Sequence, residues 1–339
     1  MKKNEKRFVG VDDGFFSIKV FTGDKSISIP SRAAKGITLV DSGDGDTGFI
    51  FNTDSGDTFT VDANVPGALD TRTLTTDYPV SNVNRVLVHA ALVAAGLGGE
   101  ECEIVTGLPV SHYYLPNTDK NEFLVSKKKE SISKPVTCGV EGNTPVAQIS
   151  RNEVCSEAIA AFIDQMIDND GNQTANADSL KNGVTCVIDI GGQTTDCAVL
   201  NPGMRINMQR SGSSEVGVLY LYDEIKIKLA TKFSINISSI TKRQVESALK
   251  NGSISIYREV HDVSHEVEQC KASLFDRIQT AINEHVGDDS DIETLIFVGG
   301  GAIVFGTEIQ NAYRGALIPA EPEFANARGM YKLIRFMAR

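Results

Sequence analysis

Two glycine turns, far apart in the chain, each bring aspartate together with hydroxyl side chains. The first runs through Asp12-Asp13-Gly14-Phe15-Phe16-Ser17, and the second through Asp189-Ile190-Gly191-Gly192-Gln193-Thr194-Thr195-Asp196. Glycine has no Cβ, so the backbone can approach a ligand closely, and successive N–H groups and hydroxyls can face an anion. An acid beside such an anion cradle indicates a cation between them, and Mg²⁺ with a nucleotide phosphate is the usual case. For the second turn alone, the alternative is a tight turn between two core strands.

Apolar, β-prone residues flank both turns and predict that each turn joins the two strands of a hairpin. A third glycine cluster, Gly299-Gly300-Gly301, follows the apolar run 295–298 and predicts a strand that turns into a helix. The two hairpins, each followed by an apolar helix, predict two related α/β domains that face each other across a nucleotide cleft. The sequence contains no P-loop, G-x-x-x-x-G-K-[ST], and its glycine turns do not fit a Rossmann G-x-G-x-x-G.

Composition limits the partners and the compartment. The 339 residues can form two domains, and the net charge of −11 argues against broad direct contact with DNA, which needs a basic face. The six cysteines form no C-x-x-C pair, which indicates buried free thiols in a reducing compartment. The most apolar expected helix, residues 86–99, is too short to cross a bilayer. We therefore expect a cytoplasmic protein that binds no membrane.

Hydrophobic periodicity places the elements that must position the turns. We expect a buried strand at 103–109 and helices at 80–97 (with Ser81 as N-cap), 151–167, 218–230 and 261–285.

Two charged stretches lie between these elements. Residues 49–61 predict a small β hairpin within the acidic stretch Asp41–Asp62, and a solvated edge is favoured over a calcium site because the EF-hand spacing is missing. The run Lys127–Lys129 is expected on a solvated connecting loop.

As a set, these motifs resemble the actin-like ATPase superfamily, which includes sugar kinases and heat-shock chaperone ATPases. The match is closest to the plasmid-segregation actins of the ParM/StbA type and covers nearly the whole chain. The first turn through Lys19 resembles the first phosphate loop, the second turn the second phosphate loop, and Val298–Gly301 the adenosine motif. Stretches that resemble the segregation actins in particular are Gly107-Leu108-Pro109, Gly212-Ser213-Ser214 with Gly217, and Gly329-Met330-Tyr331.

The resemblance implies an α/β, actin-like fold of two related domains with an interdomain nucleotide cleft, each domain carrying a smaller inserted subdomain. Domain I would comprise residues 1–165, with a small β subdomain at about 30–78, and would be completed by residues 325–339. Domain II would comprise residues 166–324, with an inserted subdomain at about 220–290.

The resemblance also assigns roles at the cleft. Asp12 and Asp189 would hold Mg²⁺ mainly through its waters, and Lys19 would reach the phosphates as a point charge. The residues that would bind ATP, or GTP as the alternative, are Asp12, Gly14, Phe15, Lys19, Gly191, Gly192, Gln193, Thr194, Gly217, Gly299, Gly300 and Gly301.

Catalysis would need Asp189 and a residue that orients the attacking water. The family has a glutamate at the start of the helix that links the two domains, and the ungapped alignment puts Asn152 there, with Glu153 one residue later. A carboxylate and an amide can each orient water. We favour Glu153 and keep Asn152 as the alternative.

The function that the resemblance implies is ATP hydrolysis coupled to assembly into dynamic filaments that segregate plasmid DNA. The partners would be further copies of the chain and a ParR-like DNA-binding adaptor on a centromere-like plasmid site. One alternative is a phosphotransferase of the same superfamily that acts on a sugar or a carboxylic acid. Another is a nucleotide-regulated scaffold that does not hydrolyse its nucleotide.

Overall fold

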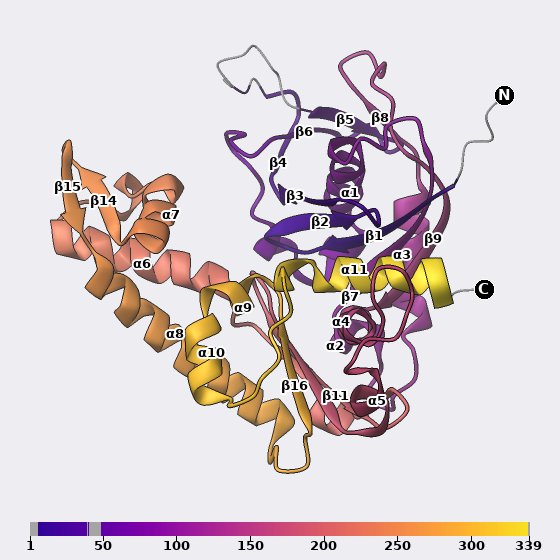
Figure 1. Cartoon of the computed structure of the whole chain (residues 1–339). Helices are drawn as coiled ribbons and strands as arrows, with labels where there is room; N and C mark the ends of the chain where they lie inside the picture. Colours follow the sequence, from indigo (N-terminus) through magenta and orange to yellow (C-terminus); the bar gives the residue numbers. More distant parts are fainter. Residues whose placement is uncertain (1–5, 39, 41–48, 338–339) are drawn as a thin grey trace.

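The computed structural model describes residues 6–38, 40 and 49–337 and consists of two lobes. One lobe is built mainly from the first half of the chain, coloured indigo to magenta in Figure 1, and the other mainly from the second half, coloured pink to orange. Residues 41–48, which hold part of the acidic stretch for which calcium was the alternative, lie outside the described residues. No helix in the described ranges is long and apolar enough to cross a membrane.

The first lobe is organised around a five-stranded sheet in the order β3-β2-β1-β7-β9. Its strands are β1 (Arg7–Asp13), β2 (Ser17–Phe21), β3 (Ser26–Pro30), β7 (Glu101–Leu108) and β9 (Gln148–Ser156). Strands β1, β2 and β3 form an antiparallel meander, whereas β7 and β9 are parallel to β1. Parallel neighbours need a crossover, and α1 (Asn82–Ala94) and α3 (Glu122–Ser133) lie in the two crossovers. The hydroxyl of Ser81 accepts the N–H of Asn84, which confirms the predicted cap of α1.

The second lobe repeats the same plan. Its sheet has the order β12-β11-β10-β16, and β13 also pairs with β11. The strands are β10 (Thr185–Ile190), β11 (Thr195–Asn201), β12 (Arg205–Ile206), β13 (Gly212–Ser214) and β16 (Thr294–Val298). As in the first lobe, an antiparallel hairpin lies beside a parallel strand, here β16 next to β10. This repetition confirms the predicted hairpins and the predicted α/β class.

Long helices cover the second sheet, and each lobe carries a small sheet of its own. Helices α6 (Val218–Phe233) and α8 (Ser264–Val286) pack against each other beside the second sheet. The small sheet of the first lobe has the order β4-β6-β5-β8, with β4 (Ala33–Lys35), β5 (Phe49–Thr53), β6 (Thr58–Val61) and β8 (Val136–Cys138). That of the second lobe is the hairpin β14 (Ser253–Ile256) and β15 (Glu259–Asp262), which follows α7 (Lys242–Asn251).

The remaining elements are short, apart from two helices that lie where the lobes meet (Figure 1). These two are α4 (Glu157–Met166) and α11 (Ala325–Lys332), which pack against each other. The others are α2 (Val110–Tyr113), α5 (Ala177–Asn182), α9 (Gly300–Val304), α10 (Gly306–Ala312), the 3₁₀ turns Thr71–Val80, Met208–Arg210, Ile237–Ser239 and Pro322–Phe324, and a π-helical turn at Leu333–Met337.

The predicted helix start at Arg151 is wrong. Strand β9 pairs with β7 as far as the Leu108–Ser156 register, so the helix begins only at Glu157. Helix-like spacing of apolar residues continues back into residues 151–156, but these residues pair with the parallel strand β7 and are therefore in a β-strand. The six cysteines are all buried free thiols, as predicted.

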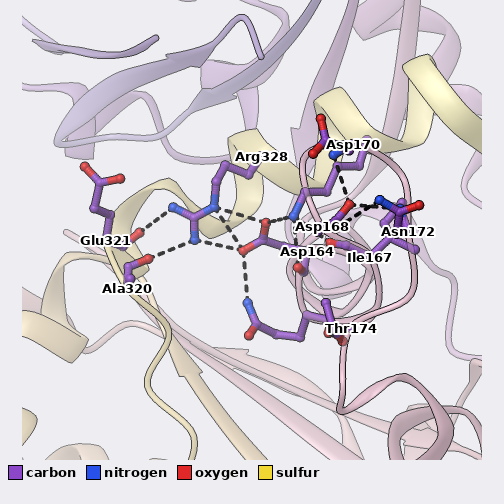
Figure 2. A network of polar contacts seen from close by, with 11 residues as sticks. Asp164, Ile167, Asp168, Asp170, Asn172, Thr174, Ala320, Glu321 and Arg328 are labelled. Carbon is purple, nitrogen blue, oxygen red and sulfur yellow. Dashed lines mark hydrogen bonds and ion pairs between the residues drawn. The ribbon is translucent and has the colours of Figure 1, made fainter. Parts of the chain in front are cut away.

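A buried ionic network ties α11 to α4 (Figure 2). The carboxylate of Asp164 on α4 accepts from the guanidinium of Arg328, with a shortest distance of 2.8 Å, and from the Lys332 ammonium at 2.6 Å. The Arg328 guanidinium also donates to the backbone carbonyls of Ala320 and Glu321, on the segment that leads from the second lobe into α11. We call Asp164, Arg328 and Lys332 the α11 clamp. Lys332 is therefore a buried ammonium within this network rather than an exposed basic residue.

Removing Asp164 should destabilise the protein strongly. In Asp164→Ala, Arg328 and Lys332 would be left buried without their carboxylate, and we expect a loss of about 3–5 kcal/mol in the free energy of unfolding. The matched control is Glu130→Ala, which removes an exposed ion pair with Lys134 and should cost less than about 1 kcal/mol. Urea unfolding followed by circular dichroism measures both. Equal losses in the two variants would contradict a structural role for the α11 clamp.

Candidate active site

The three glycine turns meet at one cavity of about 340 Å³ between the lobes. Of the predicted binding residues, those that line the cavity are Asp12, Gly14, Phe15, Lys19, Asp189, Gly191, Gly192, Gln193, Thr194, Gly299 and Gly300. Two predicted residues, Gly217 and Gly301, do not line it. A Cβ at Gly217 would lie 2.7 Å from the Gly192 carbonyl oxygen, and one at Gly301 would lie 2.1 Å from the Ile190 side chain. These two glycines are required for close packing beneath the turns.

The first turn is fixed by bonds to its carbonyls. The Gly14 carbonyl accepts from the hydroxyls of Ser31, at 2.7 Å, and Tyr78, at 3.2 Å. The Phe15 carbonyl accepts from the Thr71 hydroxyl at 2.8 Å. These three hydroxyls come from other segments of the chain and stabilise the backbone of the turn.

The second turn is attached to the start of α6. The carbonyls of Gly191 and Gly192 accept the N–H groups of Val218, at 3.0 Å, and Leu219, at 2.8 Å. A Cβ at Gly192 would lie 2.6 Å from the Cβ of Phe16, so the two turns pack directly against each other. Two separate constraints therefore favour glycine at position 192: the close contact with Phe16 of the first turn, and the close approach of a ligand to the backbone.

Buried carboxylates crowd the cavity. Burial, together with the neighbouring Asp12, raises the pKa of Asp189 to about 7. Burial also raises the pKa of Glu157 far above its usual range, and Asp12 and Asp196 contribute to the shift. Burial opposes the charge on Lys19, but Asp12, whose carboxylate lies 2.9 Å from the ammonium, outweighs this and raises the Lys19 pKa. The site therefore holds more carboxyl groups than its lysines can pair, and the raised pKa values favour the neutral, protonated acids.

This excess of acid fits a divalent cation. Among the described residues, no group of three or more His, Cys, Asp or Glu side chains is arranged to hold a metal directly. Mg²⁺ dehydrates reluctantly and usually keeps several waters, so it needs only one or two carboxylates from the protein. Asp12 and Asp189 would hold it in this way, and the added positive charge would relieve their mutual repulsion.

Glu157, which the sequence-based assignment missed, is the carboxylate at the first position of the interlobe helix α4. It lines the cavity and lies against Gly107, where a Cβ would be 2.5 Å from its Cγ. Neither Asn152 nor Glu153 lines the cavity. Both lie in β9, where Glu153 forms ion pairs with Lys129 and Arg151, and the Asn152 amide donates to the Lys129 carbonyl. A signal was present, because Ser156 followed by Glu157 is a typical N-cap and first-turn pair.

The predicted position of Lys128 on a solvated loop is also wrong. This lysine lies on α3, and its ammonium contacts both carboxylate oxygens of Asp13, at 2.7 and 2.9 Å. The Asn84 amide donates to the same carboxylate at 2.8 Å. All three side chains are buried, and the Lys128 ammonium also donates to the Gly107 carbonyl. The spacing of Val125, Lys128 and Ile132 on one helical face could have predicted this orientation.

Part of the cavity wall is apolar and suits a flat ring. Leu249, Ile303, Val304 and Phe324 contribute to this part of the lining. The carboxylate of Glu323 also lines the cavity, and its Oε2 is buried without a hydrogen-bond partner in the described structure. The cavity combines glycine turns suited to phosphate groups, acidic side chains suited to a cation, and an apolar wall suited to a base. These are the elements that a nucleotide site needs.

The raised pKa of Asp189 predicts how stability changes with pH. Because the folded pKa is about 7 and the ordinary value is 3.8, the folded protein binds this proton more tightly than the unfolded chain. The resulting stabilisation is fully present below about pH 4 and is lost as the pH rises through about 7. The free energy of unfolding without nucleotide should therefore fall across this window, by at most about 1.4 kcal/mol per pH unit from this group.

Urea unfolding between about pH 5 and pH 7.5 tests this. Asp189→Asn removes the titrating group but keeps the size of the side chain, so its stability should depend less on pH than that of the wild type. An unchanged slope in Asp189→Asn would show that Asp189 does not titrate in this window.

Comparisons with known proteins agree with this geometry. The family described as plasmid segregation protein ParM, N-terminal, matches residues 9–167. The family described as archaeal actin homologue MreB-like, C-terminal, matches residues 187–311. No curated protein matches the chain.

Similar solved structures match over nearly the whole chain. An archaeal actin homologue aligns with a TM-score of 0.72 and 24% identity, over 96% of this chain and 98% of that one. A complex of the same homologue with ADP gives the same values. A subunit of a 15-stranded ParM filament from Clostridium botulinum aligns with a TM-score of 0.74 and 16% identity, over 97% and 99% of the two chains. The chain thus has the actin-like fold, with a match to the ParM N-terminal family model over residues 9–167 and to an actin-homologue family model over residues 187–311.

Proposed function

We propose that the protein is an ATPase that assembles into dynamic filaments and segregates plasmid DNA through a DNA-binding adaptor. The observation that carries the proposal is the convergence of two acid-glycine turns and the carboxylate of Glu157 on one interlobe cavity. The ADP complex of the archaeal homologue and the filament of the Clostridium botulinum ParM support the nucleotide and the assembly, respectively.

In this proposal the chain binds the phosphates of ATP, with GTP as the alternative, between the two turns. Gly14 and the stretch 191–194 supply backbone and hydroxyl donors, and Lys19 exchanges its ion pair with Asp12 for a phosphate oxygen. Mg²⁺ would neutralise charge on the phosphates and would be held through water by Asp12 and Asp189. Phosphoryl transfer then depends mainly on positioning and on charge neutralisation.

Glu157 is proposed to orient the attacking water and to accept its proton. Its carboxylate lines the cavity, and because its pKa is raised, the deprotonated carboxylate is a stronger base than that of an exposed glutamate. A bound cation would favour this deprotonated form, since the neighbouring acids contribute to the raised pKa. Because Glu157 is the first residue of the helix between the lobes, a change at the phosphates can alter how the lobes sit relative to each other. This provides the proposed link between hydrolysis and filament lifetime.

The partners follow from charge and from the family. With a net charge of −11, the chain is poorly suited to bind DNA phosphates itself, since each such contact needs a Lys or Arg. One basic side chain of the run Lys127–Lys129 is buried against Asp13 and cannot contribute. The proposed partners are therefore further copies of the chain and a ParR-like adaptor on a centromere-like plasmid site, in the cytoplasm. The domain boundaries 1–165 with 325–339 and 166–324 stay predictions.

Glu157→Gln tests the proposed function. We expect this variant to bind ATP but to hydrolyse it at least about 10²-fold more slowly, because it loses the proton acceptor. Its filaments should form on addition of ATP and Mg²⁺ and should persist longer than wild-type filaments. Phosphate release and light scattering, recorded on the same sample, measure both effects.

The matched control is Glu153→Gln, which removes a carboxylate from β9 outside the cavity and should behave like the wild type. If Glu153→Gln slowed hydrolysis and Glu157→Gln did not, the assignment of Glu157 would be wrong. ATP turnover without any scattering by the wild-type protein would contradict the filament proposal and favour a small-molecule phosphotransferase.

A further inference from the structure

A side chain from α11 reaches across to the second phosphate turn. The Asn326 amide Nδ2 donates to Oδ2 of Asp189 at 2.7 Å, although the two residues belong to elements far apart in the chain. Asn326 is only 4% exposed, and its Oδ1 has no hydrogen-bond partner among the described residues. The bond to Asp189 is thus the hydrogen bond that the structure records for the Asn326 side-chain amide, which is almost completely buried.

The other oxygen of Asp189 is confined as well. Gly299 has a φ of +82°, and a Cβ at this position would lie 2.2 Å from Oδ1 of Asp189. The carboxylate is therefore held between the β16–α9 turn on one side and the Asn326 amide on the other. These two contacts restrict the orientation of the half-buried Asp189 carboxylate.

Helix α11 itself is held firmly in place. Arg328 and Lys332, further along the same helix, form the α11 clamp with Asp164, and Figure 2 shows the Arg328 guanidinium between that carboxylate and the carbonyls of Ala320 and Glu321. Asp164 lies on α4, the helix that begins with Glu157. The clamp thus fixes, through two packed helices, the position of Asn326 relative to Glu157.

We propose that Asn326 is a positioning residue that orients the Asp189 carboxylate toward the hydrated Mg²⁺ of the bound nucleotide. This inference rests on the proposed function, because it concerns the same site. In metal sites, a hydrogen bond to a ligating or water-binding carboxylate orients it, and loss of such a partner typically reduces metal affinity by about 10–100-fold. Asn326 would carry out this role from α11, which packs against β1 of the first lobe, on an acid of the second lobe, so Mg²⁺ binding would depend on how the lobes are placed.

The test compares ADP affinity with and without Mg²⁺ for the wild type and for Asn326→Ala. ADP is titrated by calorimetry in the presence of MgCl₂ or of EDTA, and the ratio of the two affinities is the readout. In Asn326→Ala we expect this ratio to fall about 10-fold or more, with the affinity in EDTA changed less than about 2-fold. A merely structural role would reduce both affinities together and would leave the ratio unchanged.

Two further variants make the comparison independent of folding defects. Ile334→Ala, also near the C-terminus, removes a buried apolar side chain away from the cavity, and it should keep the wild-type ratio. Asn326→Ser retains a hydroxyl donor and should give an intermediate ratio. A wild-type ratio in both Asn326 variants would overturn the inference and leave the nucleotide site intact. If the wild type failed to bind ADP under either condition, the proposed function itself would be wrong.

Discussion

The crowding of buried carboxylates between the lobes is the constraint on which the rest of the structure depends. Asp12, Asp189, Asp196 and Glu157 approach one cavity, and burial alone makes it costly to keep all of them charged. A lone domain would relieve this cost by letting the acids reach water. Here two sheets, each ending in an acid-glycine turn, hold the acids together at one cavity, where a bound cation would supply the compensating charge.

Glycine packing and buried ion pairs make this arrangement rigid. Phe16 lies directly against Gly192, so the turns of the two lobes are in contact before any ligand binds. The Lys128–Asp13 pair supports the first turn, and the α11 clamp holds the helices that lie between the lobes. Each buried pair is costly to break by removing one partner, because a charge would then stay buried alone. Burying these charged groups carries a desolvation cost that apolar side chains would not have, and the resulting ion pairs fix the positions of the helices and of the first turn.

The sequence predicted the local features of the site better than its long-range contacts. The three glycine turns, their flanking strands and the Ser81 cap could be read from residues that neighbour one another in the chain. Glu157 was missed because the helix was predicted to begin at Arg151. In the structure, pairing with β7 keeps β9 in strand form up to Ser156, so the helix begins at Glu157. Lys128 and Asn326 could not be assigned to their partners, since Lys128–Asp13 and Asn326–Asp189 join residues more than 100 positions apart. Such pairs depend on tertiary structure, and a single sequence carries no direct signal for them.

A structure determined in the presence of ADP and Mg²⁺ would show directly whether the cavity between the lobes is the nucleotide site. We expect density for a diphosphate between Gly14 and Gly191, with the Lys19 ammonium moved from Asp12 to a phosphate oxygen. We also expect density for a hydrated metal ion beside Asp189, and a ring against Ile303 and Phe324. Nucleotide bound elsewhere on the protein, or Lys19 still paired with Asp12 beside an empty cavity at saturating ADP, would contradict this expectation.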